Sequence, residues 1–195
     1  MTFYPPKINE KLARARNVGV TANADGVGTG ASFVCGAFVR FYLQIEKDTK
    51  KIVEAKFKSG GCGFLIAAAE VLSGKITGGK LVELHGSDKN FLKKEIENEL
   101  GEFPEHRAHC LDVCLESLQA AFADFRAVQI EEFTGENALI CTCFGISEET
   151  IENLIEKQSL RTIEKVTDAC NAGGGCGSCQ PLIQEILDDM ERGEI

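Results

Sequence analysis

The sequence contains no tryptophan, few histidines and methionines (three and two), and fewer basic than acidic side chains, 21 against 30. The resulting net charge of −9 argues against a nucleic-acid or anionic-membrane partner, because both attract lysine and arginine. Long apolar runs are missing as well: FLIAAAEVL at 64–72 is short and contains Glu70, so no transmembrane span is expected. The N-terminal MTFYPPKINEKLARAR lacks the apolar region of a signal peptide. We therefore expect a cytoplasmic protein.

Cysteine, by contrast, is abundant, with nine residues in a chain of 195. In the cytoplasm, cysteines serve more often as metal ligands or reactive thiols than as disulfides, and the odd number agrees with this. A hydrophobic content of 44% allows a buried core and suits one ordinary domain or two small ones. The pattern indicates two parts, 1–126 and 139–195, joined by the acidic and weakly patterned segment 127–138.

The first part is expected to contain a small antiparallel sheet and helices. Apolar residues alternate over 39–45 and again over 53–57, with the polar EKDTKK between them, which is typical of a β-hairpin. Cys35 lies just before the first of these strands. Cys62 lies in SGGCG after the second and opens an apolar helix over 64–72. Both cysteines are therefore predicted at the ends of elements.

A further candidate pair, His109 and Cys110, begins another helix. Its apolar residues recur at helical spacing and give a core-facing stripe (Leu111, Leu115, Leu118, Phe122 and Phe125). Ligands at element ends suit a metal site that must load and release its contents, because such positions move more readily than helix interiors. Taken singly, each cysteine could instead be a buried small side chain and His109 a surface residue. Cys114, one turn after Cys110, is expected to pack in the core.

The second part is predicted to be a small helical unit. Ser147 begins one helix, Thr162 caps the next, and Pro181 suits the first turn of a third. The stretch AGGGC is expected to end the second helix. Large apolar residues are few, so a bound metal centre would help to hold the unit together.

Two cysteine motifs stand in this part. Cys141 and Cys143 form a CxC pair, and Cys176 and Cys179 form a CxxC pair behind three glycines. Four thiolates suit an iron–sulfur cluster, and glycine lets backbone N–H groups approach the cluster sulfurs. The spacing also permits a four-cysteine zinc site, or a glycine-rich helix end beside unrelated buried cysteines. Outside both patterns lie Cys170, expected as a helix-end thiol, and His85 and His106, expected at the surface.

The motifs resemble two known families. ICTCFGISEETIENLIEKQSL together with AGGGCGSCQPLIQEIL resembles the bacterioferritin-associated-ferredoxin-like domain of NifU proteins, which holds a permanent [2Fe-2S] cluster. Residues 4 to about 125 resemble the IscU and NifU N-terminal scaffold domain, through ARNVG, GVGTGASFVCG, SGGCG and the HC pair. The resemblance implies an α+β scaffold domain with a small antiparallel sheet, followed by a helical ferredoxin-like domain.

The resemblance also implies roles for single residues. Cys35, Cys62 and Cys110 would hold iron, zinc or a transient cluster on the scaffold, with His109 as an optional fourth ligand. Cys141, Cys143, Cys176 and Cys179 would hold the permanent [2Fe-2S] cluster.

Two departures from the family pattern concern the scaffold part. The family typically reads CGD at its first cysteine, where this chain has CGA, so Ala37 replaces an acid. The segment before HC is FPEHR, where the family has a chaperone-recognition motif similar to LPPVK, so chaperone-assisted release is not implied. Because the sequence ends at Ile195, we expect it to lack the third domain of full NifU proteins.

The resemblance implies a scaffold for iron–sulfur cluster assembly rather than an enzyme. Its partners would be a cysteine desulfurase and apo iron–sulfur proteins, with an electron donor and a second copy of the chain as further candidates. An alternative is a redox or sensor protein that retains both of its centres. A third is a zinc-binding interaction module.

Overall fold

The computed structural model describes residues 3–47, 49–84, 88–131 and 138–192. The chain forms two compact units. The first runs from the N-terminal segment to Phe125, except for two short connecting segments, 47–50 and 80–86, and the second contains these segments and the chain from Arg126 onward. The predicted connecting segment 127–138 lies partly outside the described residues, and His85 lies outside them altogether.

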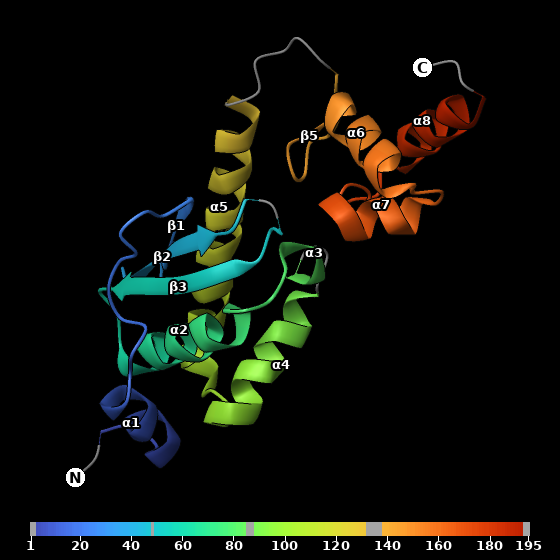
Figure 1. Ribbon diagram of the computed structural model, residues 1–195. Coiled ribbons are helices and arrows are strands. Elements are labelled where there is room, and N and C mark those ends of the chain that lie inside the picture. The colour runs from blue at the N-terminus through green and yellow to red at the C-terminus, as the bar shows by residue number, and fades with distance from the viewer. Residues whose placement is uncertain (1–2, 48, 85–87, 132–137, 193–195) are drawn as a thin grey trace. The chain divides into compact units, whose positions relative to one another are not determined.

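An antiparallel sheet forms the first unit's framework (Figure 1). Its strands are β1 (Gly26–Ala31), β2 (Phe38–Ile45) and β3 (Ile52–Ser59), hydrogen-bonded in that order. The predicted hairpin of β2 and β3 is confirmed, with Phe41 opposite Phe57. Strand β1 is not predicted by the sequence pattern, because it alternates with glycine rather than with large apolar residues.

Those glycines allow a helix to approach the sheet closely. Helix α5 (His109–Glu131) runs behind the strands in Figure 1. A Cβ atom at Gly28 would clash with the helix backbone at Ser117 and Ala121. The hydroxyl of Ser117 is fully buried and lies 2.8 Å from the carbonyl oxygen of Gly28 and 3.0 Å from that of Val39. Helix α5 is thereby fixed against β1 and β2.

The same sheet face carries α2 (Gly63–Ile76), which packs mainly against β3. This helix starts one residue before the predicted range 64–72 and continues one turn beyond it. The other elements before α5 are α1 (Pro6–Ala13), α3 (Leu81–Leu84), α4 (Lys89–Leu100) and a short 3-10 helix over Glu105–Arg107.

Glu70, which interrupts the apolar run of α2, anchors the ARNVG segment. Its carboxylate is buried and accepts hydrogen bonds from the backbone N–H groups of Arg16 and Asn17, each over 3.0 Å. Residue Val18 then pairs with Phe57 in a parallel bridge. A buried carboxylate is stable when its oxygens are hydrogen-bonded in this way.

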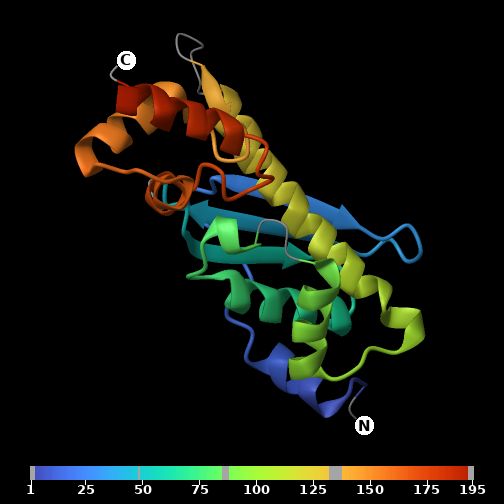
Figure 2. The same ribbon diagram turned by 90° about the vertical axis from the view of Figure 1, so that its right-hand side faces the viewer.

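The second unit is mainly helical, as expected (Figure 2). Its C-terminal helices are α6 (Glu148–Gln158), α7 (Ile163–Cys170) and α8 (Gln180–Arg192), and the short helix α3 also belongs to it. Ser147 and Thr162 cap α6 and α7 as predicted. A two-stranded ribbon of β4 (Leu139–Cys141) and β5 (Ile146–Ser147), which the sequence analysis did not predict, precedes them.

Helix α7 ends one step before the expected glycines. Asn171 takes the left-handed conformation, with φ 65°, and the glycine stretch follows it. Asparagine is the residue that most often replaces glycine at this position, because its short polar side chain tolerates positive φ. The three glycines are thus free for another role.

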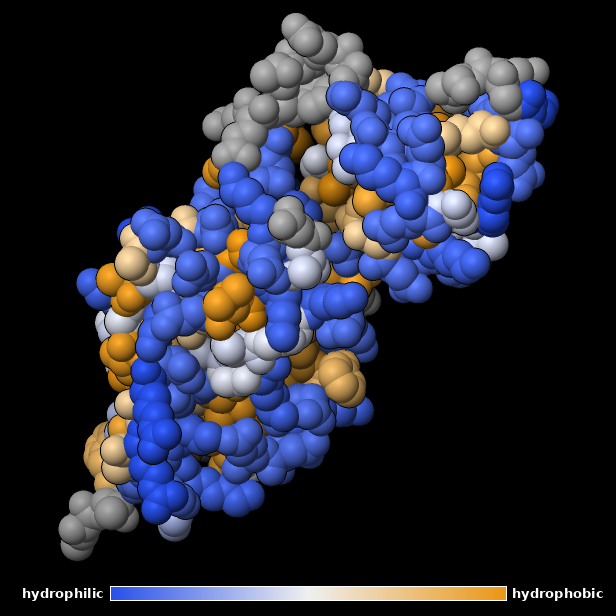
Figure 3. Space-filling view, viewed as in Figure 1, coloured by the Kyte–Doolittle hydropathy of each residue, from blue (hydrophilic) through white to orange (hydrophobic). Residues whose placement is uncertain are grey.

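The surface in Figure 3 is predominantly hydrophilic, with hydrophobic residues in small groups. Within the described ranges, no helix has both the length and the apolar character needed to cross a membrane.

Candidate metal centres

Cys35, Cys62, His109 and Cys110, here called the first cluster, are brought together by the first unit. Cys35 lies in the loop between β1 and β2, Cys62 is the N-cap residue of α2, and His109 and Cys110 open α5. The Cys35 sulfur is 3.4 Å from Nε2 of His109, and the sulfurs of Cys62 and Cys110 are 3.7 Å apart. A third distance, 3.9 Å from the Cys110 sulfur to the His109 Nε2, links the two pairs.

Cys35 is the exposed member of the first cluster. The Ser32 hydroxyl, the backbone N–H of Ala37 and His109 stabilise its thiolate and lower its pKa to about 7. The Gly36 residue, at φ 68°, makes the turn that returns the Ala37 backbone toward Cys35. A thiol with this pKa is about half ionised at neutral pH and so offers a nucleophile or ligand there.

Cys110 is the buried member, with 1% of its surface exposed. Burial, together with the neighbouring Cys62 thiol, raises its pKa to about 12. Cys114 lies deeper still, and burial raises its pKa further. Cys114 therefore packs in the core as expected.

The spacings within the first cluster fit metal ligation. Two thiolates on a tetrahedral metal with bonds of about 2.3 Å lie about 3.8 Å apart, close to the separation of Cys62 and Cys110. A thiolate and an imidazole on one such metal lie about 3.6 Å apart, close to the separation of Cys35 and His109. In the described part of the chain, no three His, Cys, Asp or Glu side chains stand ready to hold a single ion. The first cluster is therefore arranged as two pairs.

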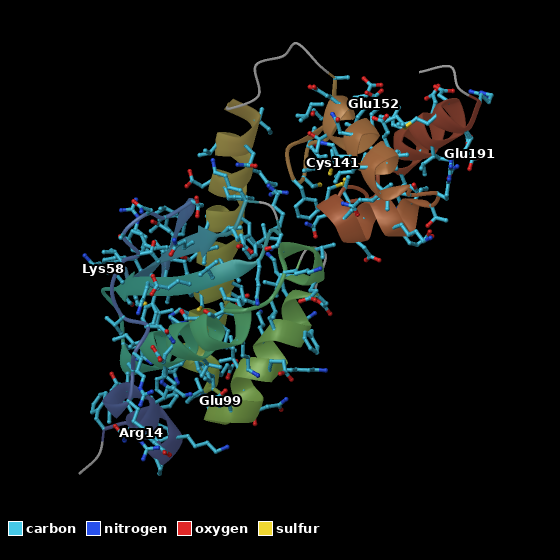
Figure 4. The ribbon with its side chains drawn as sticks, in the orientation of Figure 1. Arg14, Lys58, Glu99, Cys141, Glu152 and Glu191 are labelled. Atoms are coloured by element: carbon cyan, nitrogen blue, oxygen red, sulfur yellow. The ribbon has the colours of Figure 1, made fainter. Side chains whose placement is uncertain are left out.

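The four cysteines of the second unit, here called the second cluster, also come together. The Cys143 sulfur is 3.5 Å from that of Cys176, and the thiols of Cys141 and Cys179 are hydrogen-bonded to each other. Each pair thus takes one cysteine from the CxC motif and one from the CxxC motif. Figure 4 shows sulfur atoms gathered beside Cys141.

The glycines before the CxxC motif allow this approach. A Cβ atom at Gly175 would lie 2.9 Å from the Cβ and 3.0 Å from the sulfur of Cys143, closer than real side chains pack. Gly173 and Gly177 have positive φ angles of 84° and 78°, which glycine adopts without strain. The predicted role of glycine as a residue that lets the chain come close to the cysteines is consistent with these positions.

Burial and hydrogen bonding shift the pKa values of the second-cluster cysteines in opposite directions. Burial raises the pKa of both Cys141 and Cys143. Cys176 is exposed, and its pKa is lowered to about 7, first by the Ser178 hydroxyl and then by the Ser178 backbone N–H. Among the nine cysteines, all of which are described, Cys35 and Cys176 are the exposed ones.

Two cysteine pairs suit a two-iron cluster, in which each iron takes two thiolates and the irons share bridging sulfides. A single zinc ion would require all four sulfurs around one point. The pairing in the second cluster therefore fits a [2Fe-2S] group better than zinc.

Some expectations concern residues outside the two clusters. Cys170 is buried at the end of α7 and its thiol donates to the carbonyl oxygen of Val166, as expected for a helix-end thiol. His106 is exposed, as expected. Ser32 and Ser178 are not among the predicted site residues, although each lies within three residues of a candidate ligand, close enough in the chain to donate to its sulfur.

Two family models match the chain. Residues 3–132 match the NifU-like N-terminal domain, and residues 139–189 match the BFD-like [2Fe-2S] binding domain. The resemblance inferred from the motifs is thereby confirmed for both parts.

Individual relatives agree with these matches. The chain is 34% identical to the nitrogen fixation protein NifU of Nostoc sp. (strain PCC 7120) over 191 residues, which cover 97% of this chain and 61% of that protein. It is 31% identical to the iron–sulfur cluster assembly scaffold protein IscU of Aquifex aeolicus, over 78% of this chain and 94% of that one. The chain thus spans about three fifths of the length of the NifU relative.

A solved structure supports the fold. The N-terminal part of a nitrogen-fixing NifU-like protein from Brucella abortus superposes with a TM-score of 0.51 at 16% identity, covering 64% of this chain and 94% of that one. At this identity the likeness concerns the fold alone. It agrees with the predicted α+β scaffold domain.

Proposed function

Because the chain belongs to the NifU-like N-terminal domain family, we propose that it is a scaffold for iron–sulfur cluster assembly. A transient iron–sulfur group is built on the residues of the first cluster and is then delivered to an apo-protein. The second cluster holds a permanent [2Fe-2S] group. The chain acts as a carrier of this cargo rather than as a catalyst.

The observation that carries the proposal is the construction of the first cluster. Its side chains come from a loop and from the first residues of two helices, and Cys35 is exposed while Cys110 is buried. Such a site has firm ligands on the helices and an accessible ligand on the loop. Iron and sulfide can therefore enter and leave at Cys35 while Cys62 and Cys110 remain bound to the metal.

Local structure prepares Cys35 for this role. The Ser32 hydroxyl and the Ala37 N–H favour the thiolate, which is the form that binds metal and accepts sulfur. His109 lies on the same thiolate and supplies a second donor atom to a metal bound there. Ser32 and Ala37 lie in the loop between β1 and β2, and His109 is the first residue of α5, so all three are close to Cys35 in the protein without cargo.

The second cluster supports a permanent group. Three of its four cysteines are buried, and they come from two short motifs. When bound, a [2Fe-2S] group supplies one-electron chemistry. The chain's own residues hold it, exclude water from Cys141 and Cys179, and leave Cys176 at the surface.

The proposal implies partners by chemistry. A cysteine desulfurase supplies sulfur, apo iron–sulfur proteins receive the assembled cluster, and an electron donor serves reductive steps. We place these exchanges in the cytoplasm, in agreement with nine cysteines that are all free thiols.

The second candidate is a redox protein that retains both centres. Ala37 favours it, since the first cluster has no carboxylate at the position where the resembling scaffolds carry one. Carboxylates are harder ligands than thiolates and exchange more readily on iron. Cluster transfer separates the two candidates.

The test is a transfer assay with the full chain. After reconstitution with iron and sulfide under reducing conditions, the protein is mixed with an apo-ferredoxin, and both proteins are separated and analysed for iron and sulfide. We expect the acceptor to gain iron and sulfide in equal amounts while the second-unit spectrum stays unchanged. Retention of all iron by the chain would instead favour the redox protein.

Two variants serve this assay. Cys62→Ala should abolish transfer and leave the spectrum of the purified protein intact. Cys114→Ala is the matched control, because Cys114 is a buried cysteine one turn beyond Cys110, and it should transfer as the parent protein does.

A further inference from the structure

Ser178 lies inside the CxxC motif, between two proposed ligands. Its hydroxyl oxygen is 3.2 Å from the sulfur of Cys176, with the thiol as donor. A cysteine that binds metal has lost its proton. The proton of this hydrogen bond then comes from the serine, and the hydroxyl becomes the donor to the sulfur.

The local turn holds Ser178 in this position. Gly177, at φ 78°, folds the chain back directly after Cys176, and its carbonyl oxygen accepts from the backbone N–H of Gln180 over 3.0 Å. The backbone N–H of Ser178 is also directed at Cys176. One residue thus supplies two donors to one sulfur, of which only the hydroxyl depends on the side chain.

Two other proposed ligands of the second cluster accept hydrogen bonds from backbone N–H groups and not from a hydroxyl. Cys141 accepts from the backbone N–H groups of Phe144 and Gly173, and Cys143 from that of Cys176. Among the described residues, Ser178 supplies the one side-chain hydroxyl that bonds to a cysteine of this cluster. It acts on Cys176, the exposed cysteine, and therefore on the pair of Cys143 and Cys176.

We propose that Ser178 is a tuning residue for the [2Fe-2S] group of the second cluster: its hydroxyl donates to the Cys176 sulfur and favours the reduced state. The inference rests on the proposed ligand set. Reduction adds one electron from a one-electron donor, places more negative charge on the sulfurs and changes no bond at Ser178. A hydrogen bond to sulfur strengthens with that charge, so it stabilises the reduced form more than the oxidised form.

The test is a redox titration of the full chain, followed by visible absorbance and by the EPR signal of the reduced state. Ser178→Ala removes the hydroxyl and keeps the backbone donor. At a fixed ambient potential we expect the ratio of reduced to oxidised protein to fall about fivefold, which is a downward shift of about 40 mV for one electron. Ser178→Thr keeps the hydroxyl and should restore the parent value.

Thr142 provides the matched control. It is an exposed hydroxyl residue between Cys141 and Cys143, and within the described ranges it makes no hydrogen bond to a cysteine. Thr142→Ala should leave the potential unchanged.

The possible outcomes test the role of Ser178 separately from the four-cysteine ligand set. A Ser178→Ala protein that keeps its cluster and its potential would overturn the role of Ser178 alone, because water would then replace the hydroxyl. An unchanged potential with a lowered melting temperature would assign the serine to helix packing and would likewise overturn it. A parent protein without visible absorbance or iron in its second unit would overturn the ligand set itself.

Discussion

In the first cluster the four side chains come from three separated places in the chain, whereas in the second they come from two motifs of three and four residues. The first depends on the sheet and on two helices being packed before its members can meet. The second depends on one turn of glycines against the β4–β5 ribbon. Assembly from separated elements suits a site that opens, and assembly from short motifs suits a site that stays closed.

The two clusters share one feature. Each combines an exposed thiol, whose pKa is lowered to about 7 by a nearby serine hydroxyl, with at least one buried thiol whose pKa is raised by burial, Cys110 in the first cluster and Cys141 and Cys143 in the second. The difference in proposed behaviour therefore does not come from the acidity of the thiols. It comes from the backbone segments that position them, which are separated elements in the first cluster and two short motifs in the second.

The largest effect is expected at the second cluster. Cys176→Ala should remove the visible spectrum of the purified protein and most of its iron, because three thiolates cannot complete a four-cysteine two-iron site. Iron analysis and absorbance measure this. Cys170→Ala, a buried cysteine outside the cluster, should keep both. An unchanged spectrum in Cys176→Ala would remove Cys176 from the ligand set.

A large structural effect is expected at the first unit alone. Gly28→Ala places a methyl group against the backbone of α5 and should lower the free energy of unfolding by about 2 to 3 kcal/mol. Circular dichroism during thermal unfolding reports it, while the visible spectrum of the second unit should not change at low temperature.

Gly74→Ala is the control for this experiment. Gly74 lies exposed near the end of α2 with no atom within 4 Å of an added Cβ, and alanine there should stabilise by about 0.5 to 1 kcal/mol. Equal stability of the two variants would show that the close approach of α5 carries no energetic weight.

A smaller effect concerns thiol reactivity in the metal-free protein. Cys35 and Cys176, with pKa values of about 7, should be alkylated by iodoacetamide at rates that rise with pH and level off above pH 8. Cys110, with a pKa of about 12, should react more slowly than either of them at every pH in this range. Peptide mass spectrometry assigns the sites.

Ser32→Ala sharpens that measurement. The loss of the hydroxyl removes the main cause of the lowered pKa of Cys35, so its pH profile should move toward 9 while that of Cys176 stays in place. Parallel movement of both profiles would contradict a local cause.

The smallest expected effect is at Ala37. This side chain is 9% exposed, and its Cβ lies beside Gly61, the residue before Cys62, so it stands between two members of the first cluster. Ala37→Asp introduces a harder ligand and admits water, and it should speed loss of the first-cluster iron to a chelator about two- to fivefold. Equal or slower loss would show that Ala37 only packs and that His109 sets the rate of release.

Much of this arrangement could be predicted from local patterns. The β2–β3 hairpin follows from alternation, and the caps of α6 and α7 follow from Ser147 and Thr162. The positions of Cys35, Cys62 and Cys110 at element ends follow from the glycines and apolar runs around them. Each of these depends on neighbours in the sequence.

What local patterns could not predict depends on distant partners. Strand β1 is buried by α5, about ninety residues away, and its glycines carry no apolar signal. In the second cluster, each pair takes one cysteine from the CxC motif and one from the CxxC motif, and this pairing likewise requires the folded unit. The donors Ser32 and Ser178 can be read from the sequence, but the orientation of their hydroxyls toward Cys35 and Cys176 depends on the turns made by Gly36 and Gly177.

The pairing of one cysteine from each motif also ties the chain into loops. Cys143 and Cys176 are 33 positions apart, and the pair of Cys141 and Cys179 encloses them. A bound metal group at these cysteines would cross-link the unfolded chain as a disulfide does, and closing a loop of this length removes conformational entropy worth about 4 kcal/mol. For a unit with a small apolar core, that restriction is comparable to its whole stability. Loss of the metal group should therefore loosen the second unit as a whole.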